Sequence, residues 1–444
     1  MAEAFDLADL HRWDDRIRER VAAFGLDCFP QEFEVCDHHQ MLGYMAYSGM
    51  PSHYPHWSYG KSYEKLKTLY DYGVTGLPYE MVINSNPSIA YLMRDNSLLL
   101  QILTIAHVYG HNDFFKNNAT FRGTRPEYVL ATFKAQARRI RSYVEDPSIG
   151  VDEVESVLDA AHALAFQCRR NLAVRPATSA AGDDGAYRVP AAPDEDLLLF
   201  LRDHNPALSD WQRDLLSIVH ETTQYFIPQI ETKIMNEGWA TFWHKRILDS
   251  IDLPDGLRLE FLVRHNQVVR PTPGSLNPYH LGLRIWERIA GVDGADQPVD
   301  PKVFAVREAD RDTAFVRRHL DEELVRELNL FEFVERGDQI VVTRVADRDG
   351  WKQVRETLLR SIGTSSMPVI RVIDADYLGR RSLYLRHEHD GRDLSLEAAE
   401  KTLAYVYRLW QRDVVLETEL RGKRRLLAFG SSGFADRALD TTTS

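Results

Sequence analysis

The sequence predicts an α+β protein, with a large and mainly helical N-terminal domain followed by a small α+β domain. Helical periodicity dominates the chain up to about residue 330, and residues 331–345 (FEFVERGDQIVVTRV) then alternate apolar and polar side chains around a Gly-Asp turn. At 444 residues, the chain exceeds the size at which a single hydrophobic core usually divides. We therefore expect one domain over residues 1–329 and a second over residues 330–430.

The N-terminal domain is expected to consist largely of amphipathic helices. Residues 1–20 have helical periodicity, and longer helical patterns follow at residues 127–144 and 151–170. The segment 178–196 is rich in Ala, Gly, Asp and Pro, which is typical of a flexible linker or insertion. Helical periodicity resumes over residues 197–251.

The C-terminal domain is expected to be ferredoxin-like, because its strands and helices follow the order of a β-α-β-β-α-β unit with an added hairpin. After the hairpin of residues 331–345, the predicted elements are a helix at 351–362, strands at 369–374 and 382–387, a helix at 396–409, and strands at 414–418 and 426–429. The basic run 421–425 is typical of a solvated turn between the last two strands. The polar residues 431–444 are expected to form a disordered tail.

Charge and composition argue against several classes of protein. A formal net charge of -12 argues against broad nucleic-acid binding, which relies on basic surface. No apolar run approaches the roughly 18 residues of a membrane span, and the N-terminus is charged where a signal peptide would be apolar. The 3 cysteines form no paired metal-binding spacing and fit a reducing compartment. We expect a cytoplasmic protein without membrane insertion.

Two histidines four positions apart provide the clearest chemical signal. His107 and His111 follow the apolar run 98–105, which begins behind the capping residue Ser97. Side chains four apart on a helix project from one face, with Cβ atoms about 5–6 Å apart, so both imidazoles can reach one metal ion. Val108 occupies the position of the acid in the H-E-x-x-H zinc motif, so this helix lacks its own general base.

A second motif supplies a candidate third ligand. Residues 236–240 (Asn-Glu-Gly-Trp-Ala) resemble the helix that provides the carboxylate ligand in gluzincin metallopeptidases. Glu237 and His244 lie at positions i and i+7 of one helical face, so we expect Glu237 to bind the metal and His244 to support it. The alternative is a buried carboxylate paired with Lys61 or an arginine.

Glu221 is the predicted general base. It lies in residues 220–224 (HETTQ), a zinc motif whose second histidine is replaced by glutamine. Burial in an otherwise apolar helix would raise its pKa toward the range useful for proton transfer. The predicted zincin-like pocket therefore has His107, His111 and Glu237 as ligands of a divalent metal, an open position for water, and Glu221 as the base. Imidazole and carboxylate ligands suit zinc first, and iron or manganese as well.

Other polar residues are expected to support this site or line its pocket. The predicted loop of residues 51–61 (PSHYPHWSYGK) combines histidines, aromatic side chains and a lysine with Pro and Gly, which suits the wall of a binding site. The alternative is a loop packed by its own aromatic side chains, and the histidine pair could likewise serve only as core hydrogen-bonding groups. The predicted supporting residues are His56, Lys61, Asn112, Asp113, His220, Asn236 and His244.

Several blocks of the sequence resemble the stage V sporulation protein R (SpoVR) family. They are residues 56–61 (HWSYGK), 80–87 (EMVINSNP), 107–118, 233–244 and 390–418. Because the blocks occur in order from about residue 5 to 430, the chain is identified as a member of this family. The resemblance implies a cytoplasmic protein linked to sporulation, spore cortex formation and cell-envelope stress. It also implies a PrkA-type serine protein kinase and a von Willebrand factor A-like protein as partners.

The sequence leaves two functional classes open. One is a metal-dependent hydrolase that cleaves a peptide or amide bond, for example in a peptidoglycan precursor, through activated water. The other is a non-catalytic regulatory scaffold whose histidines hold a structural core and whose C-terminal domain docks the kinase. Val108 in place of the zinc-helix acid favours the scaffold, whereas the convergence of Glu221 and Glu237 favours the hydrolase.

Overall fold

The computed structural model divides the chain into two compact units. The residues that it describes are 5–74, 76–169, 195–271, 275–292, 297–336, 339–345, 347 and 350–439. Unit 1 comprises Met1–His53, Trp57–Lys134 and Ile227–Ser365, and unit 2 comprises Tyr54–His56, Ala135–Phe226 and Ser366–Ser444. The division into units does not show whether residues 330–430 fold independently, so the domain boundary near residue 330 stays a prediction. Most of the predicted linker, residues 178–194, lies outside the described residues.

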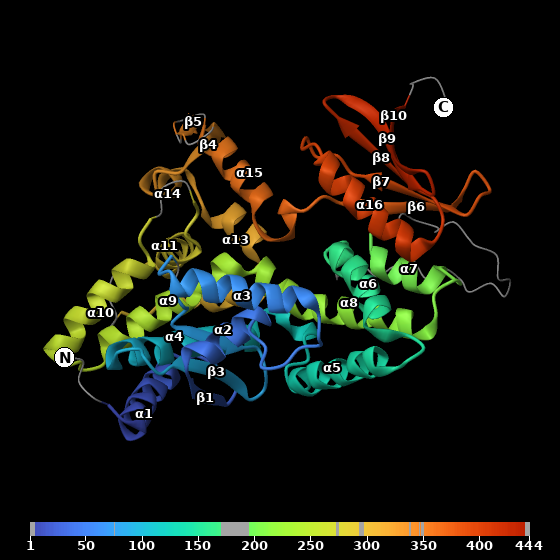
Figure 1. Cartoon of the computed structure of the whole chain (residues 1–444). Coiled ribbons are helices and arrows are strands. Elements are labelled where there is room, and N and C mark those ends of the chain that lie inside the picture. Colours follow the sequence, from blue (N-terminus) through green and yellow to red (C-terminus); the bar gives the residue numbers. More distant parts are fainter. Residues whose placement is uncertain are drawn as a thin grey trace. The chain divides into compact units, whose positions relative to one another are not determined.

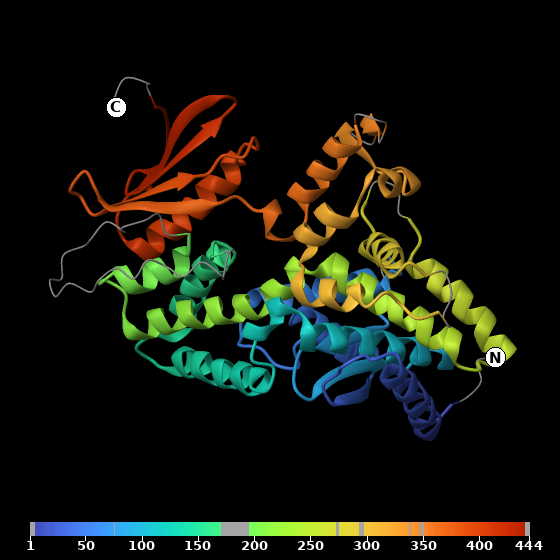
Figure 2. The same cartoon turned by 180° about the vertical axis from the view of Figure 1, so that it is seen from behind.

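Unit 1 is built around helices α4 (Leu98–Asn117) and α9 (Lys233–Ser250), which pack side by side (Figures 1 and 2). The predicted helix start is confirmed, because the Ser97 side chain accepts a hydrogen bond from the Leu100 N–H. Both helices are buried on nearly every face, as expected for helices at the centre of a large core. At the start of α9, the buried Asp312 carboxylate accepts hydrogen bonds from the N–H groups of Ile234 and Met235. This cap fixes the first turn of the helix that carries Glu237.

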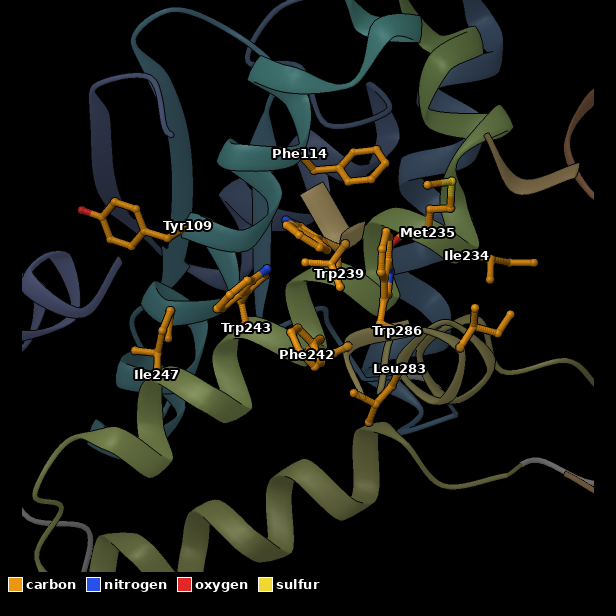
Figure 3. Packing of buried hydrophobic residues seen from close by; sticks show 14 of the residues in the cluster. Tyr109, Phe114, Ile234, Met235, Trp239, Phe242, Trp243, Ile247, Leu283 and Trp286 are labelled. Carbon is orange, nitrogen blue, oxygen red and sulfur yellow. The ribbon is translucent and has the colours of Figure 1, made fainter. Parts of the chain in front are cut away.

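Tryptophan side chains fill the core between these helices and α11 (Pro278–Ala290). The Trp239 ring centroid lies 4.7 Å from that of Trp286 and 5.4 Å from that of Trp243 (Figure 3). The Trp286 indole also donates a hydrogen bond of 3.0 Å to the Met235 carbonyl, so its single polar atom is satisfied. These contacts fix α9 against both neighbouring helices.

A three-stranded sheet and smaller elements complete unit 1. The sheet order is β1-β3-β2, with β3 parallel to β1 and antiparallel to β2. The chain continues from β2 through β3 into α4, and β2 packs near α4. The remaining elements are α1 (Leu7–Ala23), β1 (Gln31–Cys36), α2 (His38–Ala46), α3 (Trp57–Asp71), β2 (Glu80–Ile83), β3 (Ser88–Met93), η1 (Ala119–Gly123), α10 (Asp255–Val268), α12 (Lys302–Ala309), α13 (Asp312–His319), α14 (Glu322–Glu327), β4 (Phe331–Arg336), β5 (Gln339–Val345) and α15 (Trp351–Ser361), followed by η2 (Gly363–Ser366) at the boundary.

Unit 2 combines helices with a five-stranded sheet of order β10-β9-β8-β7-β6. Strands β7 and β8 are parallel and are joined through α16, whereas the other neighbouring strands are antiparallel. The elements are most of α5 (Val129–Glu145) and α8 (Asp210–Glu231), with α6 (Gly150–Leu164), α7 (Leu197–His204), β6 (Ile370–Tyr377), β7 (Ser382–His387), α16 (Leu396–Trp410), β8 (Val414–Leu420), β9 (Lys423–Gly430) and β10 (Gly433–Ala438).

The α+β class and the predicted order of C-terminal elements are confirmed, but the ferredoxin-like topology is wrong. In a ferredoxin-like domain the first strand belongs to the same sheet as the others. Here β4 pairs with β5 in a separate two-stranded sheet, and β6 to β10 lie in chain order. Residues 433–438, which we expected to belong to a disordered tail, form β10 and pair with β9. Within the described part of the chain, no helix is both long and apolar enough to span a membrane.

Close helix packing makes Gly238 a position where added volume should destabilise unit 1. A Cβ atom at Gly238 would lie 2.4 Å from the Gly282 backbone of α11, so Gly238→Ala forces α9 and α11 apart. We expect a loss of about 1–3 kcal/mol in the free energy of unfolding, measured by urea denaturation. Gly43→Ala in α2 is the matched control, because its added Cβ meets no atom within 4 Å. Equal stability of the two variants would contradict the prediction.

Candidate functional site

The structure brings together the three predicted metal ligands. His107 and His111 project from α4 toward Glu237 on α9. The Glu237 Oε2 atom lies 3.8 Å from His107 Nε2 and 3.6 Å from His111 Nε2. The spacing of the two histidines thus places both imidazoles beside one carboxylate, as the sequence predicted.

Glu80 is a fourth member of this cluster that sequence reasoning missed. It lies at the start of β2, and its Oε1 atom is 3.8 Å from His107 Nε2. One ligand atom each from Glu80, His107 and His111 lie within 4.8 Å of one another. In the sequence, Glu80 begins the block 80–87 that resembles the SpoVR family, but nothing in that block marks Glu80 as a ligand.

Hydrogen bonds to the Nδ1 atoms of His107 and His111 fix the orientation of both imidazole rings. His111 Nδ1 lies 2.9 Å from Asn236 Oδ1, so this nitrogen carries the proton that it donates to the amide oxygen. His107 Nδ1 lies 2.8 Å from His244 Nδ1, and His244 Nε2 lies 2.9 Å from His265 Nδ1. Both Nε2 atoms are therefore turned toward the carboxylates. Ligand histidines are commonly supported in this way through their second nitrogen, and the supporting roles predicted for Asn236 and His244 fit this geometry.

Burial and charge drive the pKa values of the four groups apart. Burial lowers the pKa of His111 to about 4, and the charge of His107 adds to this shift. Burial also acts to lower the pKa of His107, but Glu80 and Glu237 overcome it and raise this pKa above its ordinary value. Burial raises the pKa of Glu80. Although burial acts to raise the pKa of Glu237 as well, the neighbouring imidazoles hold it below its ordinary value.

The distances and burial fit a divalent metal ion. Among the described residues, the buried atoms His107 Nε2 and Glu237 Oε2 have no hydrogen-bond partner. Their separation of 3.8 Å exceeds a hydrogen bond but approximates the spacing of two ligand atoms around one ion, about 3.4 Å for tetrahedral bonds of about 2.1 Å. The histidine side chains are 3% and 5% exposed, whereas those of Glu80 and Glu237 are 16% and 20% exposed. Solvent therefore reaches the site from its carboxylate side.

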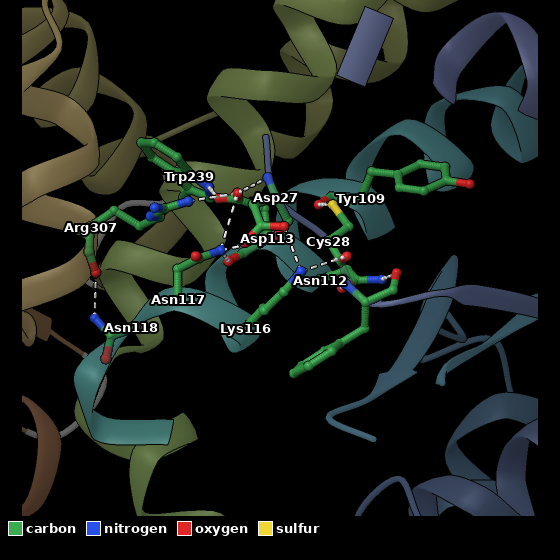
Figure 4. Close-up of polar contacts among 11 residues, drawn as sticks. Asp27, Cys28, Tyr109, Asn112, Asp113, Lys116, Asn117, Asn118, Trp239 and Arg307 are labelled. Carbon is green, nitrogen blue, oxygen red and sulfur yellow. Dashed lines mark hydrogen bonds and ion pairs between the residues drawn. The ribbon is translucent and has the colours of Figure 1, made fainter. Parts of the chain in front are cut away.

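Two of the predicted pocket residues, Asn112 and Asp113, connect α4 to other parts of unit 1 (Figure 4). The buried Asp113 carboxylate pairs with Arg307 at 2.6 Å and accepts a hydrogen bond of 2.8 Å from the Trp239 indole. The Asn112 side chain accepts a hydrogen bond of 2.7 Å from the Phe29 N–H. Because Asp113 is two positions beyond His111, it projects from a different side of the helix. These two residues hold α4 in place.

The other predicted residues have partners of their own. In unit 1, residues 57–61, which we expected to lie in a loop, belong to α3, where the Lys61 ammonium lies 5.6 Å from the ring centroid of Trp57. In unit 2, the Glu221 carboxylate accepts a hydrogen bond of 2.9 Å from Gln136, His220 Nε2 lies 3.0 Å from Asp196, and His56 Nε2 lies 3.3 Å from Asp159. Their roles in the pocket stay predictions.

Comparison with known proteins identifies the family. A family model described as "SpoVR like protein" matches residues 4–185 and 173–367, and a second, "SpoVR-like C-terminal domain", matches residues 368–421. The chain belongs to the SpoVR family. This SpoVR-family chain is 33% identical over 475 aligned residues to the "Uncharacterized protein YcgB" of Escherichia coli K12, covering 94% of this chain and 92% of the relative. No solved structure matches it significantly. The cluster of Glu80, His107, His111 and Glu237 lies within the part matched by the first model.

Proposed function

We propose that this SpoVR-family chain is a metal-dependent hydrolase of a peptide or amide bond, with a zincin-like set of ligands. His107, His111 and Glu237 would hold the metal, most favourably zinc. The observation that supports this proposal is the pair of buried atoms without hydrogen-bond partners among the described residues, His107 Nε2 and Glu237 Oε2, which face each other at ligand spacing. At 3.8 Å the imidazole and the carboxylate are too far apart for a direct hydrogen bond, and an ion between them would satisfy both atoms.

Each residue contributes a separate part of the proposed chemistry. When bound, a zinc ion would polarise the scissile carbonyl and lower the pKa of nearby water. Asn236 holds the His111 proton on Nδ1, which leaves the Nε2 lone pair toward the site. Glu237 stays ionised, because the two imidazoles hold its pKa low. The Tyr279 hydroxyl also acts to lower the pKa of Glu237.

The role of Glu80 separates catalysis from a structural role. Three protein ligands leave one position open for water, whereas a fourth closes a tetrahedral site. In the proposed hydrolase, Glu80 is not a ligand and exchanges a proton with the substrate from the solvent side. Glu221 is exposed and not buried as the sequence led us to expect, but it remains the second acid proposed for proton transfer.

A regulatory scaffold is the second candidate function. The placement of Glu80 with both histidines within 4.8 Å favours it, because a site with two imidazoles and two carboxylates could bind a structural metal and leave no open position. The family resemblance also leads us to propose a role in spore cortex formation or cell-envelope stress, in the cytoplasm, with the PrkA-type kinase and the von Willebrand factor A-like protein as partners.

Hydrolysis can be tested directly on peptide fragments of peptidoglycan. Zinc-loaded protein should give products heavier by one water in total mass, detected by mass spectrometry. Glu80→Gln or Glu221→Gln should lower the rate by about 10²–10⁴-fold if that residue transfers the proton, with zinc content unchanged. His39→Ala, a change at an exposed histidine of α2, is the matched control. Loss of zinc from Glu80→Gln, with no cleavage by the unaltered protein, would overturn the hydrolase in favour of the scaffold.

A further inference from the structure

Three buried histidines form a hydrogen-bonded row that leads from the proposed metal site to α10. His107, His244 and His265 come from α4, α9 and α10, and their ring nitrogens lie 2.8 Å and 2.9 Å apart in the two successive contacts. The Phe261 ring packs 6.4 Å from the His244 ring and 5.9 Å from the His265 ring, measured between centroids. This row of histidines is therefore surrounded by the apolar Phe261 ring as well as by imidazole rings.

Each contact has the length of an N–H···N hydrogen bond and holds one proton. His244 is fully buried and His265 nearly so, and burial disfavours a charged imidazole, so a neutral ring is favoured at both positions. A neutral imidazole donates from one nitrogen and accepts at the other. The protonated nitrogen of one ring therefore dictates the protonated nitrogen of the next.

The neighbouring carboxylates favour the charged form of His107, but metal binding through Nε2 requires its neutral form. When all three rings are neutral, only two arrangements satisfy both hydrogen bonds. In the inward arrangement, His265 Nδ1–H donates to His244, His244 Nδ1–H donates to His107, and His107 carries its proton on Nε2 beside the carboxylates. In the outward arrangement, His107 Nδ1–H donates to His244, His244 Nε2–H donates to His265, and His265 carries its proton on Nε2. Only the outward arrangement leaves the His107 Nε2 lone pair directed at Glu237, where it can bind a metal.

We infer that the three histidines form a tautomer relay that ties the protonated nitrogen of His265 to metal occupancy at His107, an inference that rests on the proposed metal site. A change from inward to outward removes one proton from His107 Nε2, moves one proton across each hydrogen bond and adds one proton at His265 Nε2. The net charge of the three histidines therefore does not change. His244 and His265 are thus positioning residues, because they act on the metal through His107.

Nitrogen-15 labelling of histidine tests the relay by NMR, with long-range proton–nitrogen spectra that identify the protonated nitrogen of each ring. After one equivalent of zinc, we expect protons on Nδ1 of His107 and on Nε2 of His244 and His265. A proton on His265 Nδ1 in the zinc-loaded protein would overturn the relay. Calorimetric titration of the same sample with zinc tests the metal site separately.

Two substitutions at His265 separate the relay from simple packing. His265→Phe removes the acceptor for His244 and should weaken zinc binding by about 10–100-fold, the usual effect of losing support behind a ligand. His265→Asn offers an amide oxygen near the same place and should restore most of that affinity. Equal affinities for the two variants would contradict the relay. If the unaltered protein binds no zinc, the proposed function fails, and the relay stands only if His265→Phe changes the protonated nitrogen of His107 or His244 in the metal-free spectrum.

Discussion

Replacing His111 with alanine is expected to weaken zinc binding by more than about 100-fold, which exceeds the usual loss from removing a supporting residue. The variant removes one of the two imidazoles beside Glu237 and leaves only two of the three proposed ligands. Although the His111 side chain is buried, many other contacts hold α4 in place, so the fold should persist. Calorimetric titration of untagged protein with zinc measures the change.

The control for this variant is His39→Ala, which removes an exposed histidine of α2 and should leave the affinity unchanged. Circular dichroism of both variants would show that their helical content is retained. Zinc affinity of His111→Ala within a few fold of the unaltered protein would exclude His111 as a ligand. The metal site would then have to be placed elsewhere.

Replacing Asp113 with alanine should have the largest effect on stability. The Asp113 carboxylate is fully buried and pairs with the nearly buried Arg307, and it also accepts hydrogen bonds from the Trp239 indole and the Asp27 N–H. Removing one partner of a buried pair leaves an uncompensated charge and typically costs about 3–5 kcal/mol. Urea denaturation of Asp113→Ala measures this loss in the free energy of unfolding.

An exposed ion pair provides the comparison. Glu397 and Lys401 lie four positions apart on the surface of α16, where such a pair contributes at most about 1 kcal/mol. Glu397→Ala should therefore change the unfolding free energy far less than Asp113→Ala. Similar values for the two variants would mean that the Asp113 network does not brace α4 as its contacts indicate.

Local patterns in the sequence predicted the local structure well. The alternation of residues 331–345 corresponds to β4 and β5, and the spacing of His107 and His111 corresponds to one face of α4. Both depend on neighbours within a few positions, which periodicity records. The ferredoxin-like arrangement depended on which strands pair. Element order alone does not determine pairing, and here β4 pairs only with β5.

The candidate site shows the same division between local and long-range information. Glu237 could be selected because it stands in a helical motif with a known chemical precedent. Glu80 and His265 carry no such local pattern, because they reach the site from a strand and a helix far apart in the chain. Asp113 was predicted to support the site or line its pocket, but on a helix two positions turn a side chain to a different face, and its carboxylate contacts Arg307 and Trp239. Only the packed structure distinguishes these cases.

The most direct test of the proposed metal site is anomalous diffraction at the zinc absorption edge from crystals of untagged protein soaked in zinc. We predict one strong anomalous peak bounded by His107 Nε2, His111 Nε2 and a Glu237 carboxylate oxygen, at ligand distances of about 2.0–2.2 Å. The distance from that peak to Glu80 would also show whether the fourth position is open or closed. A well-ordered structure without a peak between these three residues, or with its only peak elsewhere, would contradict the account.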